Sequence, residues 1–116
     1  MALVTEEWMP EENLAGHRRR NVALWEALQK HGVTEDTELR VDFFYDVPSA
    51  DAAKQLADFL RAETDYDVAV EEESVTGTTQ PTTLSPAIID QWTKWMVLAG
   101  YENGRCKFDG WGTEVP

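Results

Sequence analysis

The order of hydrophobic periodicities along the chain constrains the fold more than any other feature. Three segments repeat apolar residues about every 3.6 positions, as amphipathic helices do, and four alternate apolar and polar residues, as half-buried strands do. The predicted segments are, in order, a helix over 11–32, a strand over 37–47, a helix over 48–64, strands over 65–73 and 74–84, a helix over 85–100 and a strand over 105–111. The order is therefore a helix followed by βαββαβ.

This order predicts an α+β fold. Two strand–helix units with a hairpin between the halves favour a four-stranded antiparallel sheet with helices on one face, the ferredoxin-like arrangement, here preceded by an N-terminal helix. A length of 116 residues suits one core, so we expect a flexible N-terminus over 1–12 and a single domain over 13–116. Gly77 and Pro81 predict a weaker strand with a bulge over 74–84.

The two later helices carry recognisable end signals. Ser49 and Ser85 are predicted N-caps, Pro86 suits the first helical position, and Gly100 is a predicted helix end. Apolar residues of the last helix fall in an arc of about 120°, which predicts its core-facing stripe. The stripe consists of Ile88, Ile89, Trp92, Trp95, Met96 and Ala99. Val97 and Leu98 lie outside it, which leaves a homodimer contact through this pair as one possibility beside a monomer.

Charge limits the classes of partner. The chain has 10 Lys and Arg against 22 Asp and Glu, a formal net charge of −12, which repels phosphate backbones and argues against nucleic-acid binding. The same charge suits a partner with a basic surface, although acidity for solubility alone is the alternative. No apolar run is long enough for a membrane span, and the acidic start 1–16 does not resemble a signal peptide, so we expect a soluble cytoplasmic protein.

Residues that could support catalysis are sparse in the sequence. His17 and His31 have no Cys or His at metal-ligand spacing, and no serine stands in a G-x-S-x-G context. No phosphate-binding glycine loop is present. The lone cysteine, Cys106, is expected to be a small buried hydrophobe. The sequence therefore predicts a non-enzymatic protein with no metal and no cofactor.

Acidic residues gather around the second predicted strand, which this topology puts at a sheet edge. There they either form a solvated border that prevents strand-to-strand aggregation or face a basic partner. The candidate partner-binding residues on this stretch are Asp65, Asp67, Glu71, Glu72 and Glu73. The basic run 17–21 is expected to neutralise the acidic side chains of Glu11, Glu12 and Glu26.

The ending "KFDGWGTEVP" places Trp111 between two glycines. We expect a strand that finishes at Phe108 and a turn in which Gly110 and Gly112 adopt positive φ, so that Trp111 folds back onto the sheet or the last helix. Trp111 would then be a structural anchor, a direct partner contact, or both. An alternative is a small-ligand pocket between the last helix and strand, near Trp92, Cys106 and Trp111.

The same ending carries a resemblance. Phe108, Asp109, Gly110, Trp111 and Gly112 resemble the aromatic-Asp-Gly-Trp run that ends the regulator of ribonuclease activity B family, the ribonuclease E inhibitors. The run 75–96 is also similar to members of this group, and the match in element order covers about Asn13 to the end. The resemblance implies a non-enzymatic protein that binds ribonuclease E and damps RNA cleavage. The alternative is a small-ligand-binding or sensor domain of ferredoxin-like fold.

Overall fold

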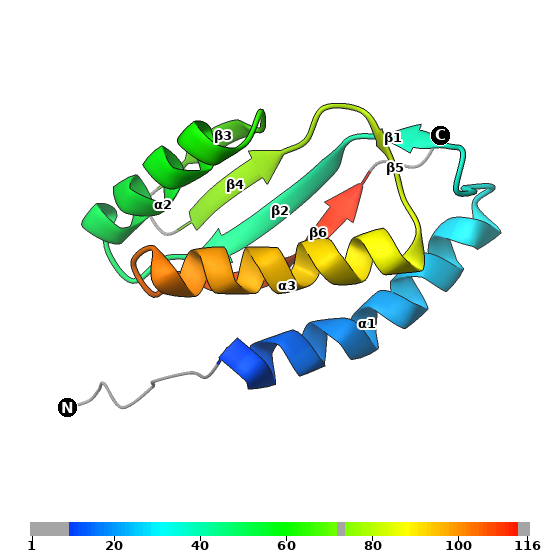
Figure 1. Cartoon of the computed structure of the whole chain (residues 1–116), viewed down its shortest axis with the longest axis horizontal. Helices are drawn as coiled ribbons and strands as arrows, with labels where there is room; N and C mark the ends of the chain where they lie inside the picture. The colour runs from blue at the N-terminus through cyan, green and yellow to red at the C-terminus, as the bar shows by residue number, and fades with distance from the viewer. Residues whose placement is uncertain (1–9, 72–73, 114–116) are drawn as a thin grey trace.

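The computed structural model describes residues 10–71 and 74–113 (Figure 1). Over these residues the chain is α+β, with three helices and antiparallel sheets. The elements are α1 (Pro10–Lys30), β1 (Glu38–Leu39), β2 (Val41–Asp46), α2 (Ala50–Glu63), β3 (Asp67–Val70), β4 (Ser74–Thr78), β5 (Thr82–Thr83), α3 (Pro86–Glu102) and β6 (Lys107–Thr113). α1 begins at Pro10, so residues 10–12, expected in a flexible N-terminus, form its first turn.

The main sheet has four strands in the order β3-β4-β2-β6, and each neighbouring pair is antiparallel. The strand order differs from the prediction because two additional short strands are present. These strands, β1 and β5, pair with each other in a separate two-stranded sheet. The segment expected as one bulged strand over 74–84 is therefore two strands in two sheets. Pro81 lies between them, and because proline has no N–H to donate, the ladder of β4 does not continue through it.

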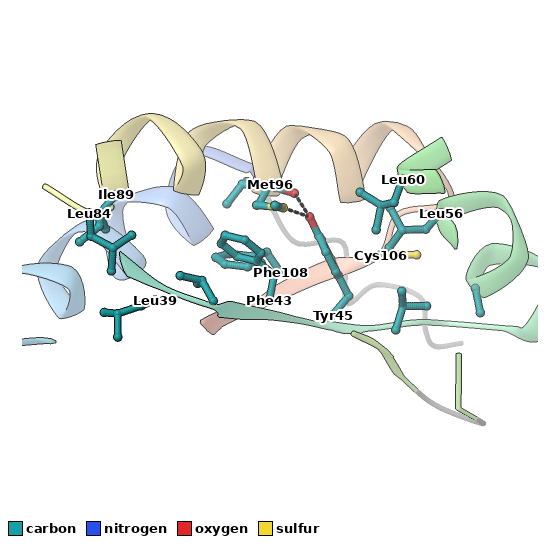
Figure 2. Close-up of a cluster of buried hydrophobic side chains, with 14 of the residues drawn as sticks. Leu39, Phe43, Tyr45, Leu56, Leu60, Leu84, Ile89, Met96, Cys106 and Phe108 are labelled. Carbon is teal, nitrogen blue, oxygen red and sulfur yellow. Dashed lines mark hydrogen bonds between the residues drawn. The ribbon is translucent and has the colours of Figure 1, made fainter. Parts of the chain in front are cut away.

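The core lies between the main sheet and the helices α2 and α3 (Figures 1 and 2). Phe43 and Tyr45 point from β2 toward α3, as the alternation predicts, and Phe44 between them is 40% exposed on the other face. The Tyr45 hydroxyl donates to the main-chain oxygen of Met96 at 2.7 Å, and burial raises the pKa of this phenol well above 10. Cys106 is fully buried, which raises the pKa of its thiol to about 11.

Both predicted N-caps are confirmed. The Ser49 hydroxyl accepts the Ala52 N–H at 3.1 Å, and the Ser85 hydroxyl accepts the Ile88 N–H at 3.2 Å. The predicted end of α3 at Gly100 is wrong, because the helix continues to Glu102. Within the described residues, no helix combines the length and the apolar content needed to cross a membrane.

The buried side of α3 is rotated from the predicted stripe. At 100° per residue, the buried residues centre about 60° away from the predicted arc. These residues are Ile89, Thr93, Met96, Val97, Ala99 and Gly100. Thr93 and Gly100 carry no apolar signal, yet they let α3 approach α1 and the sheet closely. As a result Trp95 is 38% exposed and stacks on Phe59, with ring centroids 5.9 Å apart.

Val97 is fully buried while Leu98 is 39% exposed. The prediction that both residues lie off the core-facing side of α3 is therefore wrong for Val97. Val97 is therefore not accessible to a homodimer contact, and only Leu98 of the pair lies on the surface.

Candidate partner-binding site

The acidic stretch lies at one edge of the main sheet. β3 is an edge strand, and Asp65, Asp67 and Glu71 are all exposed on it or beside its ends. We call these three residues the acidic edge. Glu72 and Glu73, also predicted to bind a partner, lie outside the described residues. The charge of the acidic edge is open to solvent, where it attracts a basic surface over about 10 Å at moderate salt.

Trp111 lies at the opposite edge of the sheet, on β6. Its ring packs against the core, and it pairs with Phe43 of β2. The indole N–H donates to Asn21 Oδ1 at 2.8 Å, and Asn21 Nδ2 donates to Thr93 Oγ1 at 2.9 Å. The Trp111 ring therefore joins β6 to α1 and α3. The structure does not bring the acidic edge and Trp111 into one site.

The predicted turn after Phe108 is wrong. β6 continues through Thr113 and pairs with β2 along its length, with a bulge at Asp109, where the register shifts between Phe44 and Tyr45. Gly110, beside the bulge, has a φ of 128°, whereas Gly112 does not adopt positive φ. Asp109 is the extra residue of the bulge, and the strand continues past it. Of the two glycines, only Gly110 uses the positive φ that other residues rarely adopt.

The buried position of His17 was not predicted from the sequence. It is buried, with 3% of its surface exposed, and its Nε2–H donates to the Phe108 carbonyl at 2.9 Å. Asn13 Nδ2 donates to the same oxygen at 3.2 Å. Burial lowers the pKa of His17; Arg20 and Lys107 lower it further, while the Phe108 hydrogen bond and Asp109 oppose the shift. Asn13, His17 and Asn21 follow each other at four-residue spacing, a polar stripe that could have indicated a contact on this face of α1.

Two adjoining hollows lie between α1 and β6, with volumes of about 220 and 420 Å³. His17, Arg20 and Asp109 line both, and Glu12 and Lys107 line the smaller one. Their charges are mixed, so neither hollow selects for one sign of ligand. Among the described residues, no three His, Cys, Asp or Glu side chains are grouped so that they could hold a metal ion.

The space predicted for a small ligand is closed. Trp92 and Trp111 border a gap between α3 and β6 that is too small to admit a water molecule. Cys106 does not border it. A closely packed contact of this kind argues against a ligand pocket at this place.

The basic run of α1 does not have the partners expected for it. Arg18 forms a bidentate ion pair with Asp90 of α3, at 2.6 and 3.0 Å, and Arg20 donates to the Gly16 carbonyl. The expected pairing with Glu11, Glu12 and Glu26 is wrong for Arg18, because α1 packs against α3 and brings Asp90 within reach.

No model of a known protein family matches the sequence, and no curated protein matches it.

Proposed function

We propose that this chain is a non-enzymatic, cytoplasmic regulatory protein that binds ribonuclease E through a basic surface of that enzyme and moderates RNA cleavage. The observation that carries the proposal is the acidic edge, three exposed carboxylates at an open sheet edge in a chain of net charge −12. The resemblance of residues 108–112 to the family of ribonuclease E inhibitors supports the choice of partner.

We also propose that the main sheet and its helices form a ferredoxin-like arrangement, to which β1 and β5 are an addition. The order β3-β4-β2-β6 supports this, since α2 connects β2 to β3 and α3 precedes β6. Folds of this kind host many unrelated functions, so the fold adds nothing to the choice of partner.

Electrostatics supplies a mechanism for such a regulator. An enzyme that binds RNA needs basic surfaces to hold phosphates, and an acidic protein is attracted to the same surfaces. Attraction between opposite fields accelerates encounter and disfavours acidic partners. A bound acidic chain then repels the RNA backbone from its neighbourhood, which lowers the rate of cleavage without any chemical step on this chain.

The test measures retention of purified ribonuclease E by the immobilised chain at low salt. We expect the triple variant Asp65→Lys, Asp67→Lys and Glu71→Lys to weaken retention by about tenfold or more, because it replaces attraction by repulsion at the contact. A matched control changes Glu35, Asp36 and Glu38 to lysine, which alters the net charge equally at exposed positions away from β3. We expect the control to weaken retention by about threefold or less.

Cleavage of an RNA substrate by ribonuclease E provides the second readout. Wild-type chain should slow cleavage, and the β3 variant should do so only at higher concentration. No retention of ribonuclease E by the wild-type chain at low salt would contradict the proposal. Equal weakening by both triple variants would show attraction by net charge alone, and would remove the acidic edge as the binding surface.

A further inference from the structure

The register between β3 and β4 determines which main-chain hydrogen-bonding groups of β3 face the free edge of the sheet. The Glu71 N–H donates to the Ser74 carbonyl at 2.9 Å and closes the hairpin between β3 and β4. Bonded pairs alternate along an antiparallel ladder, so Ala69 and Asp67 bond toward β4, while Val68 and Val70 direct their N–H and C=O groups to the free edge. Arg61 donates to the Val68 carbonyl at 3.1 Å from that side, which agrees with this polarity.

Three of the four outward groups of Val68 and Val70 are available, the exception being the Val68 carbonyl that Arg61 contacts. In the described part of the chain, neither the Val68 N–H nor the two main-chain groups of Val70 find a partner. The Val70 side chain is 46% exposed. By contrast, the outward carbonyl of Phe108 on β6 is occupied by His17 and Asn13 of α1. The sheet therefore has one edge that α1 covers and one edge that is open.

We propose that the open β3 edge binds an extended basic segment of a protein partner by β-strand addition. This inference rests on the proposed function and names its binding surface and mode. Main-chain hydrogen bonds to Val68 and Val70 supply a register, and side chains at alternating positions supply specificity. The Arg61 hydrogen bond is exposed, so water can replace it when a partner strand takes the Val68 carbonyl.

Charge and burial define the segment that fits. Asp67, Ala69 and Glu71 are exposed on the face of β3 opposite Val68, so lysine or arginine is expected opposite Asp67 and Glu71. Val68 packs toward the core and Val70 lies on the same side, so residues opposite them are apolar. The expected segment alternates basic and apolar residues. A second copy of this chain does not fit, because pairing two β3 strands would place like charges side by side.

The probe for this binding mode is a capped octapeptide of alternating lysine and valine, added to the full chain and followed by amide hydrogen exchange. We expect saturating peptide to slow exchange of the Val68 and Val70 amides by about tenfold or more, because each gains a hydrogen-bond acceptor. An octapeptide of alternating glutamate and valine should have no effect. Peptide binding without slower exchange at these amides, or no binding of the basic peptide, would overturn the inference.

Val70→Pro is the matched variant. Proline removes an N–H that points away from β4, a position that an edge strand tolerates, and we expect it to weaken peptide binding by about tenfold or more. Val70→Thr keeps the N–H and should change binding by about threefold or less. Equal binding by both variants would contradict strand addition. If Val70→Pro fails to fold, exchange in the wild-type chain still decides the question.

The Val70→Pro variant and the peptide experiment together separate this inference from the proposed function. Retention of ribonuclease E by wild type and by Val70→Pro alike would leave the function standing and reject the β3 edge as its surface. Protection of Val70 by the peptide, with no retention of ribonuclease E, would reject that partner and leave the edge as a binding site for a different basic protein.

Discussion

Gly100 lies inside α3, where two neighbours occupy the place that a side chain would need. A Cβ at this position would stand 2.6 Å from Tyr45 Cε1 and still closer to the Cys106 carbonyl oxygen. The Cys106 N–H also donates to the Gly100 carbonyl at 2.9 Å. The absence of a side chain is what allows the segment that leads into β6 to pack directly against the helix backbone.

Gly100→Ala should therefore destabilise the fold, although alanine is the better helix former. We expect a loss of about 1–3 kcal/mol in the free energy of unfolding, measured by urea titration, because the neighbouring atoms are main chain and a packed ring. Gly16→Ala is the control, since its nearest neighbour is the flexible end of Arg20 at 3.4 Å and the change favours the helix. A Gly100→Ala variant as stable as wild type would show that Tyr45 and Cys106 can move apart.

His17 makes stability depend on pH. Because burial lowers its pKa below 6.5, the folded chain binds this proton less readily than the unfolded chain does. The contribution of His17 to stability is therefore complete above pH 6.5 and is lost as pH falls from 6.5 through the lowered pKa. Melting temperature measured across this window should fall with decreasing pH.

His17→Gln serves as the comparison for that titration. Glutamine keeps an N–H donor for the Phe108 carbonyl but has no proton to gain, so the decline should be shallower in the variant. The exposed His31 remains in both chains and cancels from the difference. Identical slopes for the two proteins would show that His17 does not cause the decline.

At the scale of elements, α1 is held by polar contacts as well as by the apolar packing of Leu14, Trp25 and Leu28. His17 and Leu28 are its buried residues, and Asn13, His17 and Asn21 each bond to another element. α1 thus closes the β6 edge of the sheet by giving hydrogen-bond partners to groups that would otherwise be buried without them.

Substitution of Trp111 tests the contact that links β6 to α1. Trp111→Phe keeps an aromatic ring but loses the bond to Asn21, and we expect a cost of about 1 kcal/mol. Trp111→Ala also loses the packing and should cost about 2 kcal/mol or more, which lowers the melting temperature by several degrees. Because Trp111 and β3 lie at opposite sheet edges, retention of ribonuclease E should be unchanged. Weaker retention at an unchanged melting temperature would instead make Trp111 a direct contact.

Local signals predicted much of the secondary structure. The serine caps and the alternation through Phe43 and Tyr45 depend on neighbours in sequence, and both are confirmed. The rotation of α3 and the separate β1–β5 sheet were not predictable in this way. The rotation depends on Thr93 and Gly100, which are buried where α3 lies close to other elements. A pattern of hydrophobic residues does not indicate that a small or polar residue will be buried in such a contact.

At the scale of the whole molecule, strand order places the two candidate partner-binding regions, the acidic edge and Trp111, at opposite edges of the main sheet. Asp65, Asp67 and Glu71 could be recognised from their charge alone. Their separation from Trp111 could not, because it follows from the sheet order β3-β4-β2-β6. The molecule therefore has two different sides, one sheet edge joined to a helix and one left open with acidic borders. For the main sheet, a partner that bonds to main-chain groups is therefore expected at β3.

The contacts of β6 with β2 and α1 also affect how the chain folds during synthesis. Residues 17 and 108, joined by a hydrogen bond, are separated by 91 positions along the chain. α1 and β2 are made before α3 and β6, the two elements that hold α1, and long-range pairing of this kind slows folding. Before β6 is made, one side of β2 lacks its partner strand, and Asn13 and His17 of α1 lack the Phe108 carbonyl to which they donate. Until β6 is made, the nascent chain exposes the side of β2 that β6 later covers, and we expect chaperones to bind there.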